Sequence, residues 1–185
     1  MDAFFNRKAL NIDISNKCGL ECLRCQRQFE YRNLGLPIPG GDITIKQFNK
    51  LTDFFEEIIF SGQYSDPIHH PKFIQLLKIC HNKNIEVQVR TASSARNEEW
   101  YIKAWKANPD AQWIFGIDGL PWQSFLYRIN QDGEYLFEIM LKSKKYLNTT
   151  PRWQYIIFSY NEDKIEEAKK IANDHDLIIT FVYSS

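Results

Sequence analysis

Short β-rich runs alternate with helical segments along the chain, and this alternation limits the fold more than any other feature of the sequence. Six runs have the residue types of strands, at about 9–14, 57–61, 85–90, 112–117, 153–158 and 177–183. Helical periodicity lies between them, over about 45–56, 70–80, 97–106, 122–129, 133–147 and 161–175. Strands joined through helices pair in parallel by right-handed crossovers. The pattern therefore predicts an α/β fold, either an open doubly wound sheet or a partial barrel.

Local signals mark where three of these helices begin. Thr44 and Gln47 have the spacing of a capping box. His70-Pro71 is expected to open the next helix, because proline fits the first helical turn. Asn161 is expected to cap the charged helix before the last strand. These signals set the expected helix boundaries.

The composition fits one domain over residues 1–185. Apolar residues make up 44% of the chain, which is enough for a substantial core. No apolar run approaches the roughly 20 residues that span a bilayer, and residues 1–11 do not read as a signal peptide. Basic and acidic residues both number 23, so general nucleic-acid or membrane binding is not expected. We expect a soluble, cytoplasmic protein.

Polar turns follow five of the expected strands, at 15–18, 61–67, 91–94, 118–119 and 159–161. The carboxyl ends of parallel strands meet at one edge of a sheet, where α/β folds bind ligands. The topology thus predicts that these turns surround one site. Taken singly, 62–67 and Asp118-Gly119 also read as ordinary turns. Arg128 either binds a carboxylate bidentately or pairs with an acidic neighbour on a solvated face.

Three cysteines, Cys18, Cys22 and Cys25, lie at the start of the longest expected loop, residues 18–43, with the spacing C-x3-C-x2-C. Three thiolates on one loop can hold a single [4Fe–4S] cluster and leave one iron without a protein ligand. A small molecule with an amine and a carboxylate could chelate that iron. The fourth cysteine, Cys80, falls on the apolar face of a helix and is expected to be buried.

Two other chemistries compete for the same cysteines. Structural zinc takes four ligands, and His69 or His70 would have to supply the fourth. A dithiol redox pair made by Cys22 and Cys25 would leave Cys18 unexplained. The spacing alone favours iron–sulfur and leaves both alternatives open.

At this point the sequence resembles a known family, the radical S-adenosylmethionine (SAM) superfamily. The stretch from Asn11 to Cys25 is similar to its signature, with C-x3-C-x2-C after the first strand. Ser61–Pro67 with Ile68–Pro71 resembles its glycine-rich motif after strand two, and Thr91–Ser94 resembles its turn after strand three. Ile117-Asp118-Gly119 with Tyr127-Arg128 resembles elements of peptide-modifying and phage-type members.

The resemblance implies a fold, two cofactors and a reaction. The fold would be a partial (β/α)6 TIM-like barrel forming a single core domain. A [4Fe–4S] cluster on Cys18, Cys22 and Cys25 would cleave SAM to methionine and a 5′-deoxyadenosyl radical, which abstracts hydrogen from a substrate. The candidate SAM-binding residues are Gly62, Ser65 and Asp66 for the methionyl end, followed by Ser93, Ser94, Asp118 and Arg128.

The resemblance also implies partners. An external flavodoxin- or ferredoxin-like donor would supply the electron. The chain resembles the core without an auxiliary-cluster extension, so a large substrate, such as a peptide or other macromolecule, or a second copy in a homodimer is expected to close the barrel mouth. A glycyl-radical enzyme activase is a second enzymatic reading, and a non-catalytic zinc or iron–sulfur module is the alternative of another class.

The sequence departs from the family pattern at three places. Arg24 stands before the last cysteine, where an aromatic residue is common. Ser65-Asp66-Pro67 replaces the usual Gly-Glu-Pro, and Ala92-Ser93 replaces Asn-Gly. These departures fall at the positions expected to contact SAM and leave the three cysteines intact.

Overall fold

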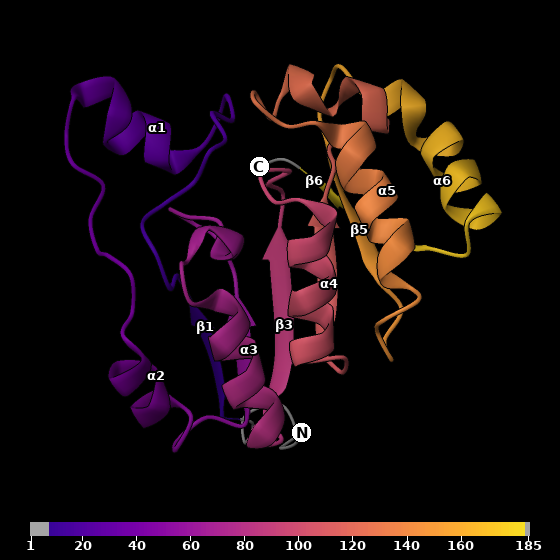
Figure 1. Cartoon of the computed structure of the whole chain (residues 1–185). Helices are drawn as coiled ribbons and strands as arrows, with labels where there is room; N and C mark the ends of the chain where they lie inside the picture. The colour runs from indigo at the N-terminus through magenta and orange to yellow at the C-terminus, as the bar shows by residue number, and fades with distance from the viewer. Residues whose placement is uncertain (1–7, 184–185) are drawn as a thin grey trace, which may run out of the picture.

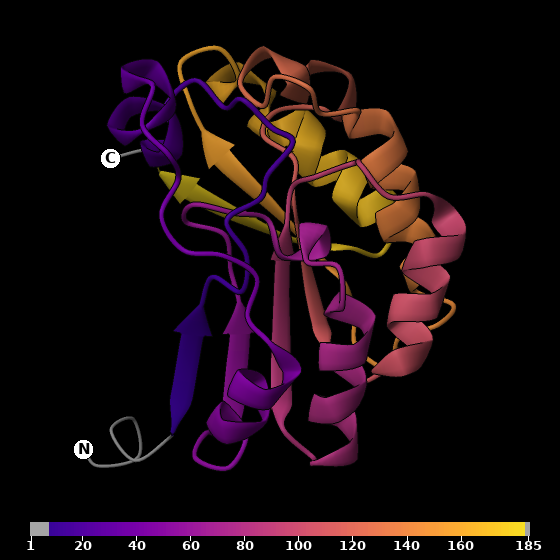
Figure 2. The same ribbon diagram turned by 60° about the vertical axis from the view of Figure 1, so that its left-hand side comes forward.

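Six parallel strands form one sheet in the order in which they occur along the chain (Figures 1 and 2). The computed structural model describes residues 8–183. The strands are β1 (Ala9–Ile12), β2 (Glu57–Phe60), β3 (Glu86–Thr91), β4 (Gln112–Gly116), β5 (Arg152–Ile157) and β6 (Ile178–Tyr183). Within these residues no strand pairing joins β1 to β6, so the curved sheet stays open at one side. The expectation of a partial (β/α)6 barrel is confirmed.

Helices connect the strands and cover one face of the sheet (Figure 1). They are α2 (Ile45–Leu51), α3 (Phe73–Asn82), α4 (Glu98–Ala107), α5 (Gly133–Ser143) and α6 (Ile165–Asp174). A shorter helix, α1 (Gln26–Glu30), lies beyond the carboxyl ends of the strands (Figure 2). Four 3-10 segments complete the connections: η1 (Arg32–Leu34), η2 (Pro67–His69), η3 (Pro121–Leu126) and η4 (Glu162–Lys164).

The hydrophobic core lies between the sheet and these helices. Alternate strand residues are buried there, because side chains of a strand point to opposite faces in turn. These residues include Val87 and Val89, Trp113 and Phe115, and Trp153 and Tyr155. On the helix side, α3 contributes Phe73, Leu76, Leu77 and Cys80, all buried as expected. The remaining strand residues therefore face the concave side of the sheet.

Two helix starts differ from the sequence prediction. The helix expected to open at His70-Pro71 begins at Phe73, because η2 comes first. The side chain of Asp66 caps η2 by accepting the backbone N–H of Ile68 (3.2 Å). Asn161 does not cap a helix: its side chain accepts the N–H of Phe158 and donates to the carbonyl of Ile156.

Two further local predictions concern the start of α2 and the loop at 18–43. Thr44 and Gln47 form the expected capping box at the start of α2. The loop at 18–43 is less irregular than expected, since it contains α1 and η1. Of the helices in the described part of the chain, none has the length and apolar character needed to cross a bilayer.

Candidate functional site

The three clustered cysteines and most of the predicted SAM-binding residues line one cavity of about 570 Å³ at the carboxyl ends of the strands. Its walls include Cys18, Cys22, Cys25, Gly62, Ser65, Asp66 and Arg128. The other three candidates are not among the residues that line it. Ser93 and Ser94 lie in the turn after β3, where the Ser93 hydroxyl contacts Nε2 of His69 (2.9 Å) and the Ser94 hydroxyl accepts the N–H of Asp132 (2.8 Å). Asp118 is buried and pairs with Arg128.

The cysteine loop is held against a distant segment of the chain. The N–H of Glu21 donates to the carbonyl of Ile129 (3.1 Å), and that of Leu23 donates to Tyr127 (3.2 Å). Within the loop, the N–H of Cys25 donates to the carbonyl of Cys22 (3.1 Å), which turns the chain into α1. The loop backbone is thus fixed on both sides of Cys22.

Metal binding by these thiols would be coupled to proton release, because burial favours their protonated form. Burial raises the pKa of Cys18 to about 12, and the nearby Asp66 carboxylate adds to the rise. Burial also raises the pKa of Cys22, while the positive charge of Arg128 opposes the rise. Because thiolates are the metal-binding form, iron or zinc would displace these protons on binding.

The donor set, three thiols on one cavity, fits a cluster. Within residues 8–183, no three His, Cys, Asp or Glu side chains converge closely enough to hold one metal ion. In a cubane each thiolate binds a different iron, so the sulfurs need only face a shared space, as these three do. His70 does not act as a fourth zinc ligand, because its Nε2 bonds the carbonyl of Ile43 (3.0 Å) and its Nδ1 accepts from Lys72 (3.1 Å).

The turn after β2 is closed by a residue that the sequence analysis did not single out, Asp13. Its carboxylate accepts the hydroxyl of Ser65 (2.6 Å), the N–H of Ser65 (3.1 Å) and the N–H of Gln63 (3.2 Å). The turn is so tight at Gly62 that a Cβ there would stand 1.7 Å from the carbonyl oxygen of Ser65. Only glycine fits this position in the observed backbone.

Asp66 connects the turns after β2 and β3. Its buried carboxylate accepts the Thr91 hydroxyl (2.8 Å), the N–H of Ala92 (2.8 Å) and the N–H of Ser93 (3.0 Å). Charge-assisted hydrogen bonds of this kind are stronger than neutral ones. In the structure, then, Asp66 positions the cavity wall through contacts within the protein.

Arg27, on α1, is a second residue that sequence reasoning missed. Its buried guanidinium donates from one nitrogen to the carbonyls of Asn16 and Tyr64, both at 2.6 Å. These contacts join the cysteine loop to the turn after β2. The only signal in the sequence is an arginine two positions after the last cysteine.

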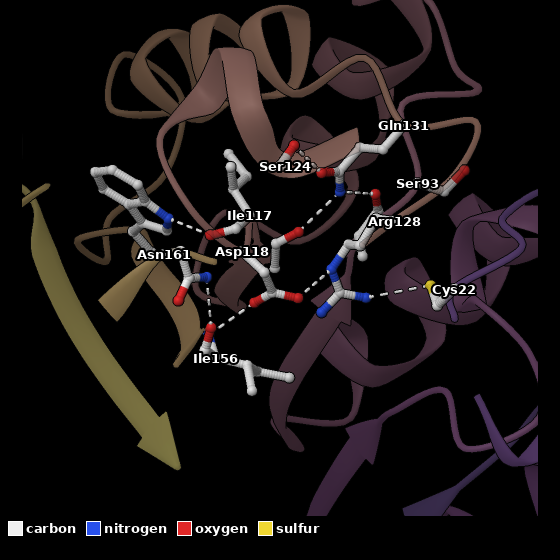
Figure 3. Close-up of polar contacts among 12 residues, drawn as sticks. Cys22, Ser93, Ile117, Asp118, Ser124, Arg128, Gln131, Ile156 and Asn161 are labelled. Atoms are coloured by element: carbon white, nitrogen blue, oxygen red, sulfur yellow. Dashed lines mark hydrogen bonds and ion pairs between the residues drawn. The ribbon is translucent and has the colours of Figure 1, made fainter. Parts of the chain in front are cut away.

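A buried ion pair places a positive charge beside the cysteine loop (Figure 3). Nε of Arg128 lies 2.7 Å from Oδ2 of Asp118, with side chains only 13% and 0% exposed. Asp118 also accepts the N–H of Ile156 (2.7 Å). On its other side, Nη1 of Arg128 lies 3.9 Å from Sγ of Cys22. Arg128 therefore pairs with an acidic neighbour, as one reading expected, but in a buried setting.

The residues around Arg128 and Asp118 influence the pKa of the carboxyl and leave space for the guanidinium. Burial raises the pKa of Asp118, and the charge of Arg128 opposes that rise. A Cβ at Gly116 would stand 3.0 Å from Nη2 of Arg128, so the glycine leaves room for the guanidinium. Gln131, also missed from the sequence, donates to the carbonyls of Ala92 (2.5 Å) and Gly116 (2.8 Å) and so ties together the ends of β3 and β4.

Comparison with known proteins gives structural matches only. No family model and no curated protein sequence matches the chain. SuiB of Streptococcus suis bound to its precursor peptide SuiA superposes with a TM-score of 0.76 at 11% identity, over 97% of this chain and 40% of SuiB. SuiB bound to S-adenosylmethionine gives 0.69 at 11% identity, over 97% and 39%.

Methylornithine synthase (PylB) gives a TM-score of 0.67 at 13% identity, over 97% of this chain and 55% of PylB. The chain thus spans about half or less of the length of these matched proteins. The match to SuiB and to PylB extends over nearly the whole chain. The chain has the same core fold as SuiB and PylB, with C-x3-C-x2-C cysteines in the loop that follows β1.

Proposed function

We propose that the protein is a radical SAM enzyme that holds a [4Fe–4S] cluster on Cys18, Cys22 and Cys25. The observation that carries the proposal is the shared cavity, in which these three thiols face the glycine turn at Gly62 and the guanidinium of Arg128. When bound, the cluster would supply the electron that cleaves SAM to methionine and a 5′-deoxyadenosyl radical, which then abstracts hydrogen from the substrate. A flavodoxin- or ferredoxin-like protein would deliver that electron.

The chain's own residues orient the cofactors and exclude water. Asp13 and Asp66 fix the two turns that form the wall opposite the cysteines. Arg128, anchored by Asp118, holds its charge next to Cys22. Hydrogen bonding to cluster sulfurs and local charge are the means by which proteins adjust cluster potential. Gly62, Ser65 and Asp66 remain the candidates for the methionyl end of SAM.

Anaerobic reconstitution with iron and sulfide tests the cluster assignment. The wild type is expected to bind about four irons per chain. Cys18→Ala, Cys22→Ala and Cys25→Ala should each lose the cluster, whereas Cys80→Ala, a core cysteine away from the cavity, should retain it. Adding dithionite and SAM to the wild type should then yield 5′-deoxyadenosine. Stoichiometric zinc with no iron uptake would instead support a non-catalytic zinc module.

A further inference from the structure

The concave face of the sheet is polar where a closed barrel of this type is usually apolar. In (β/α)8 barrels, layers of branched apolar side chains fill the interior. Here about half of the strand residues on the concave side are polar, namely Asn11, Glu57, Glu86, Gln88, Arg90, Gln112, Arg152, Gln154 and Thr180. Such side chains line a space instead of packing it. The concave face is therefore built to contact water or a polar ligand.

A second cavity, of about 750 Å³, occupies this face. Its volume lies within the range typical of small-molecule sites. It begins near the amino-terminal ends of β2 and β3 and shares Arg90, Ile114 and Gln154 with the cavity that holds the cysteines. The two cavities are thus contiguous, and a molecule that reaches down from the cluster end would enter the second one.

Two arginines stand at the same height in this cavity. The sheet register pairs Arg90 with Ile114, and Ile114 with Arg152, so the arginines flank β4 on either side. Strand spacing puts their backbones about 10 Å apart, close enough for both guanidinium groups to reach one ligand group. Both side chains are exposed to the cavity.

Neither arginine is neutralised by the protein. Within residues 8–183, no carboxylate forms an ion pair with either guanidinium, and the one hydrogen bond between Arg90 and another side chain runs to Gln88 (3.2 Å). Three carboxylates also line the cavity. Glu86 and its register partner Glu57 lie about 13 Å below Arg90, four residues earlier along the strands, and Asp110 pairs with His81 (3.3 Å) before β4. Paired guanidinium groups match the geometry of carboxylates and phosphates.

We infer that Arg90 and Arg152 bind a carboxylate or phosphate group of the substrate. The anion site itself follows from the cavity, whereas its assignment to the substrate rests on the proposed function. Gln154 and Thr180, paired one level nearer the cluster end, offer further hydrogen bonds to the same molecule. The substrate class is thus an anionic molecule whose charged end sits deep in the barrel and whose reactive carbon points toward the cluster.

Titration of the reconstituted protein with inorganic phosphate and, separately, with succinate tests this inference. Calorimetry or ligand-observed NMR should show saturable binding of at least one probe, and the tighter probe indicates which anion the site prefers. Arg90→Gln and Arg152→Gln should each weaken that binding by roughly tenfold or more. Arg152→Lys should bind the probe with an affinity between those of the wild type and Arg152→Gln, because lysine keeps the charge but lacks the planar guanidinium. Lys170→Gln, which removes one charge from the outer surface, should bind as the wild type does.

Three results would overturn the inference. The first is no saturable binding of either probe to the wild type, and the second is an equal loss in Lys170→Gln. The third is competition between SAM and the probe, which would assign the arginines to the carboxylate of SAM. Thermal melting of each variant separates lost binding from lost folding. Formation of 5′-deoxyadenosine by the wild type is measured separately, so a failure of the proposed function is distinguishable from a failure of the anion site.

Discussion

Replacing Asp118 with alanine isolates the contribution of the buried ion pair beside the cysteine loop. The change leaves the guanidinium of Arg128, only 13% exposed, without its counter-ion, and it removes the acceptor for the N–H of Ile156. Breaking a buried pair by removing one partner costs about 3–5 kcal/mol. A control pair of equal length lies on the surface, where Lys142 and Glu98 meet at 2.7 Å with side chains 40% and 45% exposed. Glu98→Ala should cost at most about 1 kcal/mol.

The reciprocal variant, Arg128→Met, has a cost that depends on pH. Without the guanidinium, the pKa of the buried Asp118 carboxyl rises further above its ordinary 3.8. An acid whose folded-state pKa is raised contributes stability at low pH and loses it as the pH rises. Folding with Asp118 protonated lowers the free energy of unfolding by about 1.36 kcal/mol for each pH unit above the ordinary pKa of 3.8. This cost is at most about 4 kcal/mol at pH 7 and about 1.6 kcal/mol at pH 5. The deficit of the variant should therefore shrink on acidification.

Urea unfolding of both single variants and the double variant, followed by tryptophan fluorescence at the two pH values, measures these costs. The double variant should be more stable than the sum of the single costs predicts, because neither charge is left alone. If the single costs add to within about 0.5 kcal/mol, the two side chains are not coupled and the reasoning fails. A pH-independent deficit in Arg128→Met would contradict the account of Asp118.

Three further predictions concern the turns and the helix start. Gly62→Ala should destabilise the protein by about 1–3 kcal/mol and abolish SAM binding by calorimetry, while Gly41→Ala, where a Cβ meets open space, should match the wild type. Asp66→Asn should cost about 1–3 kcal/mol in urea unfolding because it loses charged acceptors, whereas Asp53→Asn on the surface should be nearly neutral, and equal costs would contradict the role of Asp66. Burial lowers the pKa of His70 below 6.5, so wild-type stability should fall relative to His70→Gln as the pH drops below that value, and parallel pH profiles would refute this.

The sequence predicted the parts of the fold that depend on local pattern. Alternation at Val87 and Val89 identified a strand with one buried face, and helical spacing placed Cys80 in the core. The cysteine spacing and the position of the loop after β1 were also readable. Each of these follows from neighbours within a few residues, where side-chain type and spacing determine the outcome.

The residues that the sequence did not reveal act across long separations. Arg27 binds a carbonyl 37 residues away at Tyr64, and Gln131 binds one 39 residues away at Ala92. A carbonyl is present at every position, so no residue type in the sequence marks which one will be bound. Asp13 escaped notice for the same reason, because its partners are mainly backbone N–H groups of the turn after β2.

The distribution of charge is a further property that composition conceals. The chain has a formal net charge of zero, and Arg27, Arg90, Arg128 and Arg152 line the two cavities together with the carboxylates of Asp13, Glu57, Asp66, Glu86 and Asp110. Of these, Arg128 alone pairs with a carboxylate among the described residues, and Arg27 donates to carbonyls, which leave its charge intact. A cluster held by thiolates accounts for positive charge near Cys22 but not for Arg152, which lines only the deeper cavity. Arg90 and Arg152, at mid-height of β3 to β5, are therefore the guanidinium groups that neither the thiolates nor a described carboxylate pairs with, and they are the ones that the substrate is proposed to meet.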